Sequence, residues 1–265
     1  MGQDVAGLSY CLLFDSDLEK GAFQKNSDAE ADPLIYLLAY DAQVDSTKFL
    51  RVQNEISAFA SKLMSKRARF KTETKFLRFA FQRVHHKYLR SYSHSEPFNG
   101  IFNDGTYNCV SGAALYSCIL QQFGYKPVIY ETRYHIFLMV NLADSTRVFF
   151  ETTDPITGFE CDDREIDSRI EKYLSAEQAL LGNATALSAP FDKDVVRESI
   201  SLKQLAGLHY YNLAVDLINK QNYYDAFRSL KKASILYPKS KRIKDFLGFT
   251  AIRYESELSA AFSDR

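Results

Sequence analysis

The chain of 265 residues has little of several features that mark whole classes of protein. It has no tryptophan, and its four cysteines are too few for the disulfide framework of a small secreted scaffold, so we expect reduced thiols. No apolar run approaches the ~20 residues that a membrane-spanning helix needs. Basic and acidic residues both number 33, so no net charge draws the chain to nucleic acid or to an anionic membrane. The sequence therefore predicts a globular protein with neither a nucleic-acid partner nor a membrane span.

The N-terminus lacks the charge pattern of a secretory signal. The apolar run at residues 8–14 follows Asp4, where a signal peptide carries Lys or Arg. As it stands the sequence predicts a cytoplasmic protein, and an extracytoplasmic one if a signal peptide has been removed, so the compartment stays open.

Apolar residues at spacings of three and four predict helices, and short apolar runs rich in β-branched and aromatic residues predict strands. We expect helices at residues 35–39, 46–67, 72–89 and 109–123, and strands at residues 128–132, 135–142 and 147–152. Gly124 is placed to end the fourth helix, and residues 144–146 to turn between the last two strands. Residues 91–107, rich in turn formers, and residues 158–167 are expected to be loops. Together these elements predict an α+β fold.

The chain divides into an N-terminal segment at residues 1–40, a core at 41–190 and helices at 195–265, with a linker-like stretch at 181–194. Eight residues have the spacing of a tetratricopeptide repeat: Tyr210, Leu213, Ala214, Leu217, Ala226, Leu230, Ala233 and Pro238. The small residues Ala226, Ala233 and Gly248 would let paired helices approach closely. One repeat cannot bury its apolar face alone, so we expect these helices to pack on the core and to offer a site for a protein partner. The alternative is two core helices whose small residues occur by chance.

Three residues, in the order Cys, His and Asp, lie where the nucleophile, the base and the orienting carboxylate of thiol catalysis would need to lie. Cys109 heads the fourth predicted helix, where the positive end of the helix dipole favours the thiolate, whereas Cys118 lies inside that helix as a small apolar residue. His135 begins one predicted strand and Asp154 follows the next, so both fall at the same edge of the sheet. These residue types suit a nucleophile, a base and an orienting carboxylate. Glu151 is the alternative to Asp154 for the carboxylate.

A thiol attack on a carbonyl also needs hydrogen-bond donors for the oxyanion. The backbone N–H of Cys109 is placed to be one donor, because it lies at a helix start. We expect the second donor to be a side chain, and Asn103 is the first candidate, with Tyr107 and Asn108 after it.

The remaining polar residues indicate no cofactor and no metal. His85 and His86 are adjacent on a helix and point to different faces, and His94 and His209 have no partners at ligand spacing. The chain has no Gly-rich phosphate loop. The basic clusters at residues 66–71 and 239–244 are expected to be solvated helix ends.

Four segments, at residues 105–109, 124–127, 134–137 and 150–155, resemble the transglutaminase-like superfamily over about residues 101–157. The resemblance implies a papain-like core in which a Cys-bearing helix lies against an antiparallel sheet. It also maps the family's nucleophile, base and orienting carboxylate onto Cys109, His135 and Asp154. Some bacterial members of the family are similar to this chain in carrying a helical repeat tail.

The chain departs from that family at several positions. Asn108 stands before the cysteine where many members have Gly, and Phe137 is the nearest aromatic residue after the histidine. Without tryptophan no indole can serve the oxyanion, as it does in animal cross-linking members. The resemblance therefore implies hydrolysis of a peptide or another amide through a thioester, with a peptide or protein as substrate. The alternative is a catalytically silent scaffold that binds a protein partner through its C-terminal helices.

Overall fold

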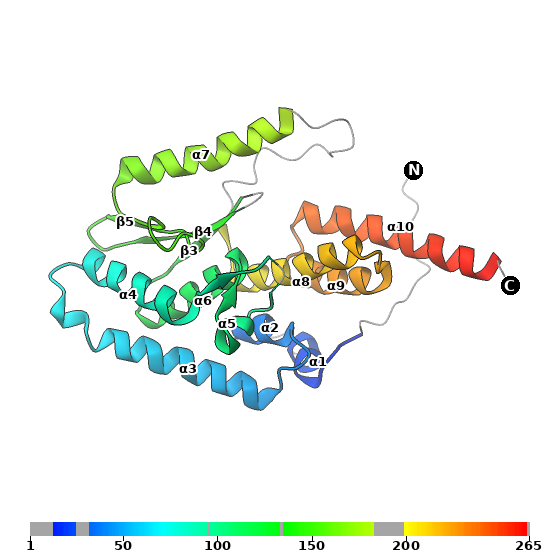
Figure 1. Cartoon of the computed structure of the whole chain (residues 1–265), viewed down its shortest axis with the longest axis horizontal. Helices are drawn as coiled ribbons and strands as arrows, with labels where there is room; N and C mark the ends of the chain where they lie inside the picture. Colours follow the sequence, from blue (N-terminus) through cyan, green and yellow to red (C-terminus); the bar gives the residue numbers. More distant parts are fainter. Residues whose placement is uncertain (1–12, 25–31, 95, 133–134, 183–198, 264–265) are drawn as a thin grey trace.

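The computed structural model describes residues 13–24, 32–94, 96–132, 135–182 and 199–263. Within these ranges the chain forms ten α-helices, a five-stranded antiparallel sheet and a small two-stranded parallel sheet (Figure 1). This confirms the predicted α+β fold. Cys11, most of the apolar run at residues 8–14 and nearly all of the predicted linker lie outside the described residues. No helix in the described ranges combines the length and apolar character needed to cross a bilayer.

The N-terminal part of the structure is helical. Its helices are α1 (Asp17–Gln24), α2 (Pro33–Ala39), α3 (Ser46–Met64) and α4 (Glu73–Tyr88). Asp45 and Thr72 cap α3 and α4, each accepting a hydrogen bond from the backbone N–H three residues on. The helix expected to reach residue 67 ends at Met64, and a 3-10 turn (Arg67–Arg69) follows it.

Helix α6 (Cys109–Gln122) begins at the cysteine because a capping box fixes its first turn. The Asn108 side chain accepts a hydrogen bond from Ser111 N at 2.9 Å, and Asn108 N donates to Ser111 Oγ at 2.8 Å. The expectation of a loop over residues 91–107 is wrong in part. That stretch contains β1 (Ser91–Tyr92), α5 (Gly100–Asn103) and β2 (Thr106–Tyr107), and β1 pairs in parallel with β2.

The larger sheet has the strand order β6-β5-β4-β3-β7, with every neighbouring pair antiparallel. Its strands are β3 (Val128–Glu131), β4 (Ile136–Asn141), β5 (Arg147–Phe150), β6 (Phe159–Glu160) and β7 (Ser199–Ile200). The predicted turn between β4 and β5 is confirmed: Ser145 has φ +67°, and Thr146 N donates to the Asp144 side chain. The connection between β3 and β4 is also short, so it keeps the start of β4 beside the end of β3.

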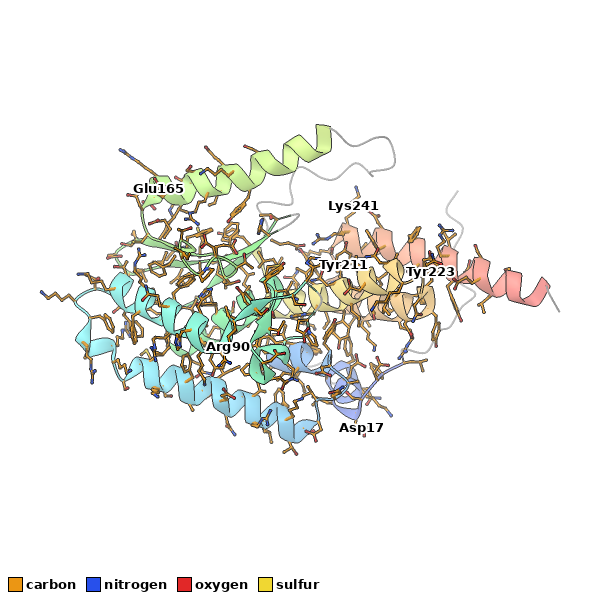
Figure 2. The ribbon with its side chains drawn as sticks, in the orientation of Figure 1. Asp17, Arg90, Glu165, Tyr211, Tyr223 and Lys241 are labelled. Carbon is orange, nitrogen blue, oxygen red and sulfur yellow. The ribbon has the colours of Figure 1, made fainter. Side chains whose placement is uncertain are left out.

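Helices cover both faces of this sheet. Helix α7 (Asp163–Gly182) lies across the face opposite α4 and α6, and side chains fill the space on both sides (Figures 1 and 2). Phe137, Met139 and Phe149 form a small core with Ile166 of α7. Because both faces are covered, residues 136–140 of β4 are all buried, where a half-exposed strand would alternate. The expectation of a loop at residues 158–167 is corrected, since β6 and the start of α7 lie there.

The C-terminal part consists of three helices, α8 (Leu202–Asn219), α9 (Tyr223–Leu236) and α10 (Lys241–Ser263). Helix α8 packs on α6 and α2, so the predicted contact between these helices and the core is confirmed. Ala226 and Ala233 are fully buried, as close helix packing requires. The expectation for Gly248 is wrong, because a Cβ there would meet nothing within 4 Å. The close approach occurs instead at Gly207, whose Cβ would lie 3.1 Å from the Cβ of Tyr237.

A buried ion pair joins the first helix to the ninth. Lys232 Nζ lies 2.9 Å from the Glu19 carboxylate, and both side chains are only 2% exposed. The hydroxyl of Tyr210 donates to the same carboxylate at 2.9 Å, and Lys232 also reaches Asp15 at 2.7 Å. These contacts fasten the N-terminal segment to the C-terminal helices across more than 190 residues of sequence.

Candidate active site

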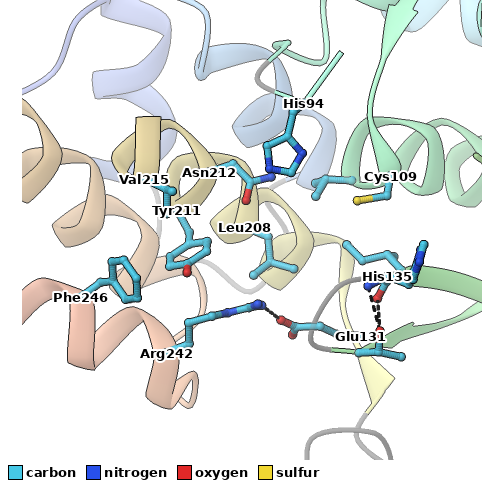
Figure 3. Close-up of a pocket in the computed structure, with 13 residues that line it drawn as sticks. His94, Cys109, Glu131, His135, Leu208, Tyr211, Asn212, Val215, Arg242 and Phe246 are labelled. Atoms are coloured by element: carbon cyan, nitrogen blue, oxygen red, sulfur yellow. Dashed lines mark hydrogen bonds and ion pairs between the residues drawn. The ribbon is translucent and has the colours of Figure 1, made fainter. Parts of the chain in front are cut away.

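A pocket of ≈ 340 Å³ opens between the first turn of α6, the β3–β4 connection, and helices α8 and α10. Cys109 and His135 both line it, together with side chains of the C-terminal helices (Figure 3). The structure therefore brings two of the three predicted catalytic residues to one cavity. It also makes the C-terminal helices part of the wall of that cavity.

Cys109 is a free, partly buried cysteine at the start of α6. Burial raises the pKa of Cys109 to about 11, and the negative charge of Glu151 acts in the same direction. The backbone N–H groups of Val110 and Cys109 donate to the sulfur and lower the pKa, as does the charge of Arg242, but burial outweighs them. The expectation that the helix start favours the thiolate is thus reversed by desolvation, and attack requires a base to remove the thiol proton.

Backbone hydrogen bonds hold His135 directly before the start of β4. Its N–H donates to Thr132 Oγ1 at 2.8 Å, and its carbonyl accepts a hydrogen bond from Thr132 N at 2.8 Å. The imidazole lies against the ring of Tyr173, with 4.9 Å between ring centroids. Its Nδ1 is 4.0 Å from Glu151 Oε2, which is within ion-pair distance and longer than a direct hydrogen bond.

Glu151 is the carboxylate that the structure places behind His135. The residue is 3% exposed, and three donors fix its side chain. Thr153 donates to Oε1 from its backbone N at 3.1 Å and from Oγ1 at 2.7 Å, and the hydroxyl of Tyr173 donates to Oε2 at 3.1 Å. The backbone is fixed by a hydrogen bond from Glu151 N to the Gly158 carbonyl. A Cβ at residue 158 would overlap the carbonyl oxygens of Glu151 and Asp154, so this turn requires glycine.

The Asp154 side chain accepts hydrogen bonds within the turn that follows Glu151. Its Oδ1 accepts hydrogen bonds from the backbone N–H groups of Ile156 and Thr157 at 3.1 and 2.8 Å, and Thr157 Oγ1 donates to Oδ2. Arg169 lies 3.9 Å away. Burial alone would raise the pKa of Asp154, but these hydrogen bonds and the Arg169 charge hold it below its usual value. Of the two carboxylates considered from the sequence, the structure brings Glu151, and not Asp154, within 4.0 Å of the imidazole.

Neither amide side chain considered as an oxyanion donor is placed for that role. Asn103 is exposed at the end of α5 and does not line the pocket. The Asn108 side chain is committed to the helix cap and donates to the carbonyls of His94 and Glu96. Tyr107 is buried and does not line the pocket. The backbone N–H groups of Cys109 and Val110 lie at the start of α6, and both lower the pKa of the thiol.

Two further features of the site are missing from the sequence-based prediction. Tyr173 comes from α7, which is not among the helices expected from the sequence. Arg242, assigned from sequence to a solvated basic cluster, forms an ion pair with the buried Glu131 at the end of β3 and covers the ring of Tyr211 at 4.9 Å. The pair spans 111 residues, and no local pattern marks either member.

A buried histidine supports the segment that carries Glu151. His85 Nε2 lies 3.0 Å from the carbonyl of Thr152, and the hydroxyl of Tyr116 lies 2.7 Å from His85 Nδ1. With the proton on Nε2, the imidazole donates to the Thr152 carbonyl, and the hydroxyl of Tyr116 donates to the carbonyl of Phe81 at 2.7 Å. Burial lowers the pKa of His85, which keeps it neutral. His86 is exposed, so the two neighbouring histidines do point to different faces, as predicted.

No protein-family model, curated protein or solved structure matches this chain. In the part of the chain that the structure describes, no group of three His, Cys, Asp or Glu side chains is placed to hold a metal ion.

Proposed function

We propose that this protein is a cysteine hydrolase of peptide or other amide bonds, built on a papain- or transglutaminase-like core. The observation that carries the proposal is the convergence of Cys109 and His135 on one pocket, with the buried Glu151 behind the imidazole. A helix that begins at the cysteine and packs against an antiparallel sheet, in which the histidine directly precedes the central strand, supports this proposal. Within this proposal Glu151 takes the role that the sequence assigned to Asp154.

The roles of the side chains follow from their placement. Glu151 faces Nδ1 of His135, so Nε2 is the nitrogen left for the thiol. Because Cys109 is neutral at rest, Nε2 removes the thiol proton as the sulfur attacks the carbonyl carbon. A C–S bond forms, and the oxyanion lies near the N–H groups of Cys109 and Val110. Glu151 stabilises the imidazolium that results.

The second half of the reaction restores the thiol. Collapse of the tetrahedral intermediate breaks the C–N bond, and the imidazolium gives its proton to the leaving amine. Water then attacks the thioester while His135 takes a proton from it. The carboxylic acid leaves as the C–S bond breaks, and the sulfur regains its proton from His135.

The test uses p-nitrophenyl acetate, a small activated ester that reports on the nucleophile without knowledge of the natural substrate. We expect release of p-nitrophenolate with an acetyl group on Cys109, located by mass spectrometry of the peptides. His135→Ala should slow acylation by about 10²–10⁴-fold, because it removes the base. Glu151→Gln should also slow it strongly, whereas Asp154→Asn should have a much smaller effect. Cys118→Ser, in the same helix, is the matched control and should react as the wild type does.

The raised pKa of Cys109 favours the second candidate function, the silent scaffold. That function is supported if Cys109 is not acetylated, or if it is acetylated at the same rate with and without His135. Either result refutes the proposed catalysis.

A further inference from the structure

We propose that helices α8 and α10 form a specificity subsite that takes an apolar side chain of aromatic size from the acyl part of the substrate. This inference rests on the proposed hydrolase function and adds the class of substrate. It concerns the half of the pocket that faces Cys109 across the cavity, away from His135 (Figure 3).

The lining of this half is mainly apolar. Leu208, Tyr211 and Val215 lie at spacings of three and four on α8, so they share one face of the helix, and all three line the pocket. Phe246 of α10 extends the surface, and its ring meets Tyr211 edge to face, with centroids 5.4 Å apart and planes at 77°. Aromatic rings arranged in this way favour a further aromatic or aliphatic group beside them.

The charges in the pocket favour an uncharged occupant. Glu131 and Arg242 form an ion pair, so each already has a partner of opposite charge, and the guanidinium also covers the Tyr211 ring. A charged side chain entering here would lose hydration beside charges that already neutralise one another. An apolar side chain loses no such hydration, and it removes apolar surface of both partners from water.

The wall is fixed with respect to the nucleophile. Helix α8 packs directly on α6, which carries Cys109, and the Arg242–Glu131 pair ties α10 to β3, whose end adjoins His135. Strand β7 precedes α8 and pairs with β3, with Ile200 opposite Ile129. Because three such connections hold it, the subsite stays at a fixed distance from the sulfur, which a selective binding site requires.

The size of the pocket limits the occupant. A volume of ≈ 340 Å³ is at the lower end for small-ligand sites, which suits one side chain with its acyl group. The remainder of a peptide substrate would lie outside the cavity.

The test compares two irreversible probes, N-acetyl-phenylalanine chloromethyl ketone and N-acetyl-glycine chloromethyl ketone. In both, the sulfur displaces chloride from the methylene carbon and the thiol proton passes to His135, so they differ only in the side chain offered to the subsite. We expect the wild type to be labelled at Cys109 about tenfold or more faster by the phenylalanine probe. Iodoacetamide, which has no side chain, gives the intrinsic reactivity of Cys109 in each protein.

Two variants alter the subsite in opposite ways. Phe246→Ala removes one aromatic wall, and Val215→Phe fills the cavity from α8; each should reduce the preference for the phenylalanine probe to about twofold or less. Ile252→Ala on α10 is the matched control, since Ile252 is 66% exposed and lies outside the pocket. It should keep the wild-type preference. Val215→Phe keeps the test decisive if loss of the Phe246 ring prevents folding.

Equal labelling of the wild type by both probes, or a preference unchanged in both variants, overturns the subsite. The hydrolase proposal fails by a different measurement, namely iodoacetamide labelling of Cys109 that does not depend on His135. The two failures are therefore distinguishable.

Discussion

Replacing Lys232 by methionine should destabilise the protein strongly, because it leaves a buried carboxylate without its cation. Lys232 and Glu19 are both 2% exposed and 2.9 Å apart. Methionine keeps the apolar stem but removes the charge, so Glu19 loses this cation while the hydroxyl of Tyr210 still donates to it. Removing one partner of a buried ion pair costs about 3–5 kcal/mol, and we expect Lys232→Met to fall in that range.

The measurement is urea unfolding followed by far-UV circular dichroism. Lys231→Met is the matched control, because Lys231 precedes Lys232 on the same helix but is more exposed. The double variant Lys232→Met/Glu19→Gln removes both charges. It should lose less stability than the two single variants together, by about 0.5–3 kcal/mol, since the groups are in contact.

The reasoning is refuted if Lys232→Met lies within about 0.5 kcal/mol of the wild type, the range of ordinary surface substitutions. It is also refuted if the effects of the two single changes simply add. Either result would mean that water reaches the pair and that the two charges are not buried together.

Three further outcomes are expected. His209 is buried, and burial lowers its pKa to about 3. Between about pH 6.5 and 3 the unfolded state therefore binds one more proton than the folded state. The free energy of unfolding consequently falls as the pH falls, by up to about 1.4 kcal/mol per pH unit. His209→Phe should flatten this slope in urea titrations at pH 4 to 6, and an unchanged slope would contradict the assignment. Gly158→Ala should lower the free energy of unfolding by about 1–3 kcal/mol in the same assay, because the new Cβ displaces the backbone carbonyl of Glu151. It should also slow acylation of Cys109. If neither quantity changes, the turn tolerates a side chain. Arg242→Met should lower the free energy of unfolding by about 1–3 kcal/mol, because it leaves Glu131 buried without that cation. Lys244→Met, an exposed change on the same helix, should leave this free energy almost unchanged. Equal effects of the two substitutions would argue against the ion pair.

Much of the secondary structure could be predicted because its causes lie within a few residues of each other. The capping box of Asn108 and Ser111 starts α6, and the turn at residues 144–146 sets the pairing of β4 with β5. The same local reasoning placed Cys109 at a helix start and His135 at a strand start. It failed for α7 although Ile166, Ile170 and Tyr173 have helical spacing, because the loop expected at residues 158–167 includes the first turn of this helix.

The sequence by itself therefore determined most of the long helices, the three central strands, and the position of a cysteine and a histidine at the starts of a helix and a strand. Only the tertiary structure decided which carboxylate faces His135. The Asp154 side chain accepts hydrogen bonds within its own turn, whereas the Glu151 side chain accepts a hydrogen bond from Tyr173 of α7. Only the tertiary structure decided that the pKa of Cys109 is raised to about 11, since desolvation depends on what packs around the sulfur and outweighs the local field of the helix. Likewise, the pairing of Arg242 with Glu131 exists only because packing brings together residues that no local interaction connects.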